Sequence, residues 1–168
     1  MDLTLDNLMD SSALNDLARQ LGFAYATNRK LEYSCNLWYC GMQERLKKIY
    51  SYQHDGWQNW DLNYTSDSFE KIETNKSNII YLSSDATETL FRPKRGEFYV
   101  IGGLVDRNFH KGFCHKKALD LGLRTAKLPL SEHVSMEQLA RPLTVNHVSD
   151  IGKGFNYCIG YLVTRKLD

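Results

Sequence analysis

The stretch that decides the fold reads Tyr99-Val-Ile-Gly-Gly-Leu-Val-Asp-Arg-Asn-Phe-His-Lys-Gly112. It begins within the apolar run 98–101, which is typical of a buried strand. The paired glycines that follow let the backbone turn sharply and approach a ligand closely, because neither carries a Cβ atom. Asp106 comes just past the end of this strand. Since open α/β sheets bind ligands at the carboxyl ends of their strands, the stretch predicts a ligand-binding loop with Asp106 placed for chemistry.

Other interpretations of this stretch stay open at this point. Asp106 also fits a helix cap or a turn, and spacing alone favours that interpretation. A dinucleotide site needs Gly-x-Gly-x-x-Gly, whereas the glycines here are adjacent and Gly112 comes nine residues after Gly103. The sequence Gly-x-x-x-x-Gly-Lys-Ser/Thr does not occur either, so a P-loop is not indicated.

Apolar runs and amphipathic stretches alternate along the chain. Residues 11–28 predict a helix, because apolar residues recur at intervals of three and four, and Ser11 or Ser12 is expected to cap its start. Further strands are predicted at residues 33–40, 78–83, 98–101 and 125–130, and further helices at residues 42–50, 85–90, 113–121 and 144–148. Strands that alternate with helices indicate an α/β domain with a mainly parallel sheet.

Length and composition fit one compact domain. The chain has 168 residues, of which 42% are hydrophobic and 24% charged, as in ordinary globular proteins. The polar and aromatic stretch 51–68 is expected to connect elements, held down by Trp57 and Trp60. No apolar run approaches the ~20 residues of a membrane-spanning helix, so no membrane partner is expected. The start Met-Asp-Leu-Thr-Leu-Asp lacks the features of a secretory signal, which favours a cytoplasmic or nuclear location.

Charge and metal-binding residue types are less informative. The net charge of +1 does not by itself suggest a nucleic-acid partner. The four cysteines form no Cys-x-x-Cys pair and the five histidines lack zinc-protease spacing, so no metal site is expected. Basic residues gather in clusters that fit either a phosphate path or ordinary solvated faces, namely Arg45, Lys47 and Lys48, then Arg92, Lys94 and Arg95, then Lys111, Lys116 and Lys117.

Four segments together resemble one family. They are Ile80-Tyr-Leu-Ser-Ser-Asp85, the stretch 99–112, Ala126-Lys-Leu-Pro-Leu130 and Pro142-Leu-Thr-Val-Asn-His-Val148. In order and spacing they are similar to the SPOUT-class methyltransferases that modify N1 of the purine at position 9 of tRNA. The resemblance implies a mainly parallel α/β sheet whose C-terminal part is threaded into a trefoil knot, an exception among folds. It also implies that the knot loops hold S-adenosyl-L-methionine.

The resemblance assigns roles to individual residues. Backbone groups would read the adenine edge of the cofactor, while leucines cover its faces. The implied cofactor-binding residues are Leu82, Gly103, Arg107, Asn108, Phe109, His110, Lys111, Cys114, His115, Leu128, Pro142, Leu143 and Thr144. The implied tRNA-binding residues are Lys111, Lys116, Arg124 and Asn146; for the basic ones among them a solvated face is an equally good interpretation. Arg107 and Asn146 are further expected to orient the purine.

Asp106 is the catalytic candidate that the resemblance implies. N1 of guanine carries a proton at neutral pH, so a base must remove it as the methyl group transfers. A carboxylate with an ordinary pKa of about 4 is a weak base, so burial would have to raise the pKa of Asp106. N1 of adenine carries no proton, and the choice between guanine and adenine therefore stays open.

Two parts of the chain depart from the family's pattern. The family has an apolar strand just before the position of Asp2 and a basic extension before that. After Val148 the run Ser149-Asp-Ile-Gly-Lys-Gly154 stands where the family continues into a long helix, and each glycine opposes a helix by about 1 kcal/mol. We therefore expect a single SPOUT-type domain over residues 1–168, truncated at the N-terminus and shortened after residue 148, without the first strand and part of the last helix.

Three functions remain open on the sequence. The leading one is a methyltransferase, expected to be a monomer, acting on N1 of guanine or adenine at position 9 of tRNA. The second is a weakly active or inactive RNA-binding or scaffold subunit of a tRNA-processing assembly, which would need a protein partner and is favoured by the altered ends. The third is a fragment without function.

Overall fold

The computed structural model describes residues 1–31, 34–105 and 110–129, and in these residues every strand pair is parallel. Strand β1 (Trp38–Cys40) pairs with β2 (Asn63–Thr65). Strand β3 (Ile79–Leu82) lies between β4 (Phe98–Ile101) and β5 (Arg124–Ala126). The predicted α/β class with a mainly parallel sheet is confirmed.

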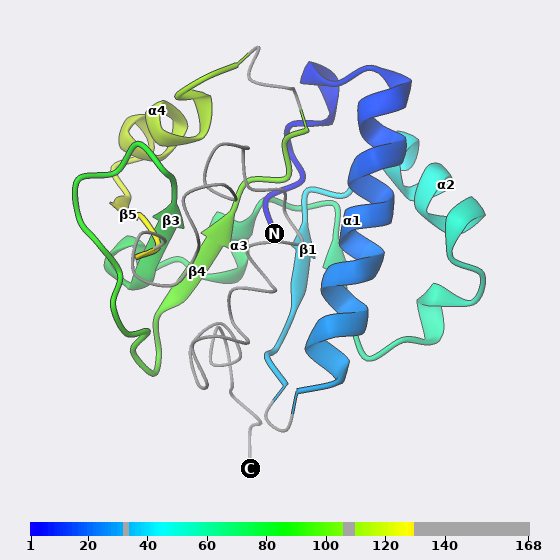
Figure 1. Ribbon diagram of the computed structural model, residues 1–168, viewed down its shortest axis with the longest axis horizontal. Helices are drawn as coiled ribbons and strands as arrows, with labels where there is room; N and C mark the ends of the chain where they lie inside the picture. Colours follow the sequence, from blue (N-terminus) through cyan, green and yellow to red (C-terminus); the bar gives the residue numbers. More distant parts are fainter. Residues whose placement is uncertain (32–33, 106–109, 130–168) are drawn as a thin grey trace.

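The first residues of the chain join the two groups of strands. The Asp2 amide donates to the Ile101 carbonyl and the Asp2 carbonyl accepts from the Gly103 amide, both at 2.8 Å. On the other side, Asp2 pairs in parallel with Cys40 of β1. The described strands therefore run in the order β2, β1, residues 1–3, β4, β3, β5 (Figure 1). Residues 1–3 thus lie at the sheet position between β1 and β4, directly after the place where the family's first strand is expected.

Helices α1 (Ser11–Arg29) and α2 (Glu44–Gln53) pack beside β1, on the right in Figure 1, and α3 (Phe69–Ile72) and α4 (Phe113–Asp120) lie nearer β3 and β4. The apolar stripe predicted for residues 11–28 is buried against α2 and β1, and the helix is confirmed. Its cap differs from the prediction. The Asp10 carboxylate accepts from the Ala13 amide at 2.7 Å, so Asp10 is the cap, whereas Ser11 already belongs to the helix.

The two tryptophans of the stretch 51–68 pack it against the rest of the protein, as predicted. Trp57 is 1% exposed and its indole N–H donates to the Ser51 hydroxyl at 2.8 Å. The Trp60 ring stacks on Tyr25 of α1 with 4.4 Å between the ring centroids. Strand β2 lies in this same stretch and was missed by the sequence analysis, because its three residues are largely exposed and show no apolar alternation.

Other predicted elements differ in extent. Strands 78–83 and 98–101 and helix 113–121 are confirmed within one residue at each end. Strand β1 covers only the last part of residues 33–40, and β5 begins one residue earlier than predicted and ends at Ala126. The helix predicted at residues 85–90 is wrong, since the Leu90 amide donates across to the Lys127 carbonyl at 2.8 Å instead of to a preceding turn. The helix predicted at 144–148 lies outside the described residues.

Candidate functional site

Three strands end together at one edge of the sheet. In the parallel register Leu82 lies opposite Ile101 on one side and opposite Ala126 on the other. Gly103 and Leu128 each follow those partners by two residues, so both come to the edge at which Leu82 ends β3. The structure therefore brings together residues that the sequence assigned to the cofactor from three separate segments. Carboxyl ends of parallel strands are the place where open α/β sheets bind ligands.

The glycine pair packs against the protein itself. A Cβ atom on Gly102 would lie 2.5 Å from the Cys114 sulfur, and one on Gly103 would lie 2.6 Å from Leu3 Cδ2 and 2.9 Å from the Asp2 carbonyl oxygen. Neither glycine is among those with a left-handed φ. The sequence predicted a sharp turn and a close ligand at this pair, whereas in the structure the two glycines let residues 1–3 and α4 approach the end of β4.

Helix α4 starts beside this edge. Its N-cap Gly112 has a φ of 75°, in the left-handed region where glycine is the favoured residue. The Phe113 amide donates to the His110 carbonyl at 3.0 Å, and the two rings lie 6.1 Å apart between centroids. In the first turn, the buried Nδ1 of His115 has no hydrogen-bond partner among the described residues. Cys114, in the same turn, lies close to Gly102, so the first turn of α4 packs on the end of β4.

A buried ion pair joins the start of the chain to α4 next to this edge of the sheet. The Asp2 carboxylate is fully buried and lies 2.6 Å from the Lys117 ammonium of α4, whose side chain is 20% exposed. The Tyr81 hydroxyl of β3 donates to the same carboxylate at 2.8 Å, and the Thr4 hydroxyl donates at 2.7 Å. This network links residues 1–4, β3 and α4 at the point where the glycine pair leaves β4.

The network shifts the pKa of its members. Burial by itself raises the pKa of Asp2, but the charge of Lys117 and the hydrogen bonds from Lys117, Thr4 and Tyr81 outweigh burial, so the pKa of Asp2 lies below its ordinary value. Burial, followed by the nearby Asp2 charge, raises the pKa of Tyr81 well above its ordinary value. Lys117 was predicted only as a member of a basic cluster, whereas in the structure it pairs with the buried Asp2, a network that was not predicted. The only feature of the sequence that could have indicated a buried carboxylate was Asp2 itself, which stands between the apolar residues Met1 and Leu3.

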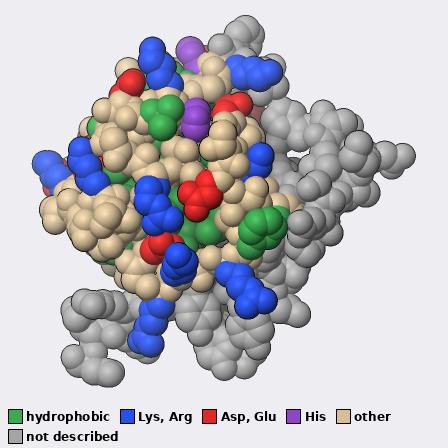
Figure 2. All heavy atoms as spheres, turned by 90° about the vertical axis from the view of Figure 1, so that its left-hand side faces the viewer, with side chains coloured by type: hydrophobic (Ala, Val, Ile, Leu, Met, Phe, Trp, Pro, Cys, Tyr) green, Lys and Arg blue, Asp and Glu red, His purple; other side chains and the backbone are tan. Residues whose placement is uncertain are grey.

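The basic residues assigned to tRNA differ in their surroundings. Lys111 and Lys116 are exposed. Arg124 is bound by acidic side chains, with its guanidinium 2.9 Å from Glu97 and 3.8 Å from Glu88. Figure 2 shows the side of the molecule that lies on the left in Figure 1; lysine and arginine side chains are spread over it, with acidic side chains among them. A phosphate at Arg124 would therefore compete with these two acidic side chains for the guanidinium.

Several predicted site residues lie outside the described residues, and their roles stay predictions. They are Asp106, Arg107, Asn108, Phe109, Pro142, Leu143, Thr144 and Asn146. Within residues 1–31, 34–105 and 110–129, no cluster of His, Cys, Asp and Glu is suited to hold a metal ion. None of the helices in that part of the chain is long and apolar enough to cross a membrane.

Comparison with known proteins shows the family of this chain. Residues 1–158 match the family described as tRNA (guanine(9)-N(1))-methyltransferase TRM10/TRM10A. The chain belongs to this family. The tRNA methyltransferase 10 homolog A of Xenopus tropicalis is 36% identical over 152 residues, which make up 90% of this chain and 45% of that protein. The tRNA (guanine(9)-N1)-methyltransferase of Schizosaccharomyces pombe is 33% identical over 154 residues, 90% of this chain and 50% of that protein. The chain thus spans about half the length of the curated relatives that it matches.

Solved Trm10 structures share the fold. Full-length spTrm10 in complex with SAH is 33% identical and superimposes with a TM-score of 0.81, over 89% of this chain and 82% of that chain. A dual-specific Trm10 from Thermococcus kodakaraensis is 14% identical with a TM-score of 0.68, over 93% of this chain and 89% of that chain, a likeness of fold alone. The chain has the SPOUT-type fold of its family, while the predicted knot falls on residues outside the described ones.

Proposed function

We propose that this chain binds S-adenosyl-L-methionine at the carboxyl edge of β3, β4 and β5 and methylates N1 of guanine at position 9 of tRNA. The observation that carries the proposal is the convergence of Leu82, Gly103 and Leu128 at one sheet edge beside the start of α4. Membership of the TRM10/TRM10A family and the likeness to a Trm10 structure solved with SAH support it. The names of the curated relatives favour guanine over adenine.

The residues at this edge suit an adenosyl group. Leu82 and Leu128 are half-buried, so each side chain keeps some exposed apolar surface that can cover a face of a flat purine. Gly103 is proposed to meet the purine edge through its main chain, of which the amide already donates to the Asp2 carbonyl. An apolar slot with a few fixed polar groups is the usual form of a cofactor site.

The chemistry divides between the cofactor and the chain. When bound, S-adenosyl-L-methionine supplies an electrophilic methyl group. Asp106, three residues after Gly103, is proposed to accept the N1 proton of guanine, and Arg107 and Asn146 to orient the base. Holding the purine in line with the methyl group supplies much of the rate, as in other positioned reactions. The exposed Lys111 and Lys116 are proposed to contact tRNA phosphates.

The proposal is tested with purified protein, tritiated cofactor and two tRNA transcripts that differ only in guanine or adenine at position 9. We expect label in the guanine transcript, mapped to N1 of that base. Leu128→Asp should abolish cofactor binding measured by calorimetry, whereas Leu119→Asp should not, because Leu119 is 56% exposed on α4. Absence of label in both transcripts, with a full-length relative active in parallel, overturns the proposal. Cofactor-independent tRNA binding in that case favours the scaffold alternative.

A further inference from the structure

An exposed, basic turn directly precedes β4. Residues 91–96 read Phe-Arg-Pro-Lys-Arg-Gly, and we call them the basic turn. Phe91 is 58% exposed, and the three cations Arg92, Lys94 and Arg95 are exposed as well. The loop that contains them runs from β3 to β4 along the left of Figure 1, the side that faces the viewer in Figure 2. The turn is therefore open to a partner, and the proposed methyl transfer gives it no role.

The three cations of the basic turn form no ion pair within residues 1–31, 34–105 and 110–129. The acidic residues that flank the turn in the sequence are Glu88 and Glu97, and both bind Arg124, at 3.8 and 2.9 Å. Burial raises the pKa of Glu97, whereas its hydrogen bonds and then the charges of Arg124 and Lys94 lower it, so Lys94 acts on it least. The positive charge of the turn is thus largely left for a partner.

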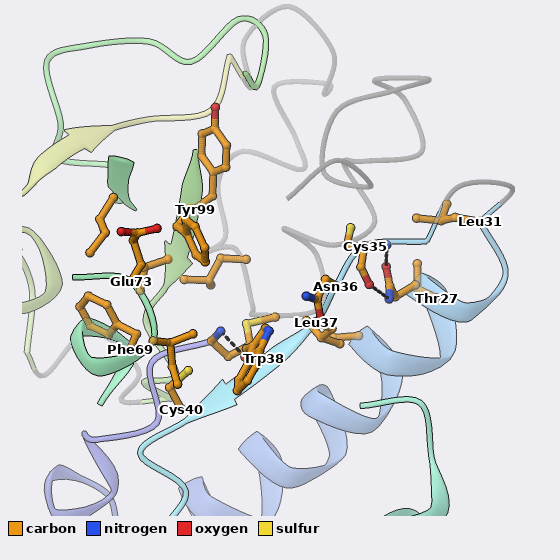
Figure 3. A pocket seen from close by; sticks show the side chains of 18 residues that line it. Thr27, Leu31, Cys35, Asn36, Leu37, Trp38, Cys40, Phe69, Glu73 and Tyr99 are labelled. Atoms are coloured by element: carbon orange, nitrogen blue, oxygen red, sulfur yellow. Dashed lines mark hydrogen bonds between the residues drawn. The ribbon is translucent and has the colours of Figure 1, made fainter. Parts of the chain in front are cut away.

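The main chain of the basic turn is held at both ends. At its start, the Leu90 amide donates to the Lys127 carbonyl at 2.8 Å. At its end, the Lys94 amide donates to the Tyr99 hydroxyl at 2.8 Å, and that hydroxyl donates to Glu97. Figure 3 shows the Tyr99 hydroxyl pointing away from the apolar cavity that its ring helps to line. The turn is therefore fixed before a partner binds, which lowers the entropy cost of binding.

The conformation of the turn presents Arg95 to solvent. The Glu97 amide donates to the Lys94 carbonyl at 3.3 Å, and Gly96 has a φ of 86°. A hydrogen bond across four residues, with a left-handed glycine as the third, is the pattern of a type II turn. Arg95 is the second residue of this turn, so its side chain leaves the protein at the corner, beside those of Arg92 and Lys94 in the sequence.

Nucleic acid is the partner that this surface suits. The guanidinium groups of Arg92 and Arg95 match the paired oxygens of phosphates, and exposed aromatic rings stack on unpaired bases of RNA. The net charge of +1 gives the whole chain little long-range attraction, so affinity for RNA must come from local clusters of cations. An anionic lipid surface is usually met by an amphipathic helix, which a turn of this length does not form.

We propose that the basic turn is a second contact for tRNA, in which Arg92, Lys94 and Arg95 bind phosphates and Phe91 packs on an unpaired base. The turn precedes β4 and the candidate cofactor edge follows it, so about 13 Å of strand separates them, and one RNA molecule can reach both. The choice of tRNA as the RNA rests on the proposed function. Phosphate contacts carry no sequence information, so the turn supplies affinity and leaves selection of the base to the cofactor edge.

The test measures binding of the whole chain to a fluorescent tRNA transcript between about 50 and 200 mM salt. Arg92→Gln, Lys94→Gln and Arg95→Gln are combined in one variant. Two or three phosphate contacts predict that the wild type loses roughly 10- to 40-fold more affinity than this variant across that range, because each contact releases counterions. The matched control combines Arg29→Gln, Lys30→Gln and Lys48→Gln, which remove the same charge from exposed positions at the end of α1 and on α2. Its affinity and salt dependence should equal those of the wild type.

Single changes test the aromatic ring. Phe91→Ala should weaken tRNA binding by roughly fivefold or more, because stacking on a base is lost, whereas Phe91→Tyr keeps a flat ring and should retain the affinity. Phe23→Ala is the matched control, because Phe23 is 54% exposed on α1, and it should bind tRNA as the wild type does.

Methylation of the same transcript is measured in parallel. Methylation by the wild type, with wild-type affinity and salt dependence in the triple variant of the turn, overturns this proposal and leaves the proposed function standing. Binding that depends on the turn without methyl transfer supports this proposal and overturns the proposed function. An equal loss in the control variant overturns the proposal. So does binding to vesicles of phosphatidylserine and phosphatidylcholine that depends on the turn while tRNA binding does not.

Discussion

Lys117→Met removes the partner of a fully buried carboxylate. In the folded protein the Lys117 ammonium lies 2.6 Å from Asp2, and the hydroxyls of Tyr81 and Thr4 donate to the same carboxylate. Methionine keeps most of the length and apolar contact of the lysine stem but no charge. The variant therefore isolates the contribution of the ion pair to the free energy of unfolding.

The expected loss is about 3 kcal/mol at pH 7. Removing one member of a buried pair typically costs about 3–5 kcal/mol, because a charge is left buried without compensation. The lower end applies here, since the Lys117 side chain is 20% exposed and Asp2 keeps its two hydroxyl donors. For a chain of this size the loss corresponds to a melting temperature lower by roughly 6–12 °C. Lys116→Met, at the exposed neighbouring position, should change stability by less than about 0.5 kcal/mol.

The pH dependence gives a second check. Because the pKa of Asp2 is lowered in the folded state, its contribution is present above the ordinary value of 3.8 and is lost as pH falls through the lower folded value. Without Lys117, burial raises the pKa of Asp2, and protonation of Asp2 removes the unpaired buried charge that destabilises the variant. The difference in the free energy of unfolding between wild type and Lys117→Met, measured by urea denaturation, should therefore begin to narrow above pH 3.8, as pH falls through the raised pKa of Asp2 in the variant, and narrow further below it. A loss under 1 kcal/mol at pH 7, or a difference that does not change with pH, refutes the assigned role of the pair.

Three further changes follow from the structure. Asp10→Ala removes the cap of α1 and should lower the free energy of unfolding by about 1 kcal/mol in urea denaturation, whereas Asp10→Asn should retain most of it. Gly103→Ala brings a methyl group 2.9 Å from the Asp2 carbonyl and should cost about 1–3 kcal/mol by thermal unfolding; a neutral result would mean that residues 1–3 do not pack as described. Asp106→Asn should slow guanine methylation in single-turnover assays most where Asp106 is ionised and N1 of guanine still carries its proton, while cofactor affinity is unchanged, and an unaltered pH profile would remove the base role.

Local pattern was enough to predict the elements whose burial follows their periodicity. Leu14, Leu17 and Leu21 recur at helical spacing and are all fully buried, so residues 11–28 were recognisable as a helix. The apolar runs of β3 and β4 predicted buried strands for the same reason. Strand β2 offered no such pattern, because it forms only through its pairing with β1.

The candidate site was predictable only in part. Resemblance to a family placed Leu82, Gly103 and Leu128 at one site, and the parallel register brings them to one edge. The reason for the glycine pair could not be found locally, because its packing partners Asp2 and Leu3 come from the start of the chain. The Asp2–Lys117 pair joins residues 115 positions apart, a contact that depends wholly on how the sheet is assembled.

The central claim is that the carboxyl edge of β3, β4 and β5 binds the cofactor. Hydrogen exchange of the whole chain, with and without saturating S-adenosylhomocysteine, tests it most directly. We predict protection in residues 82–84, 102–105, 110–116 and 127–129, and unchanged exchange in β2. Absence of binding, or protection confined to residues outside these four segments, would contradict the account.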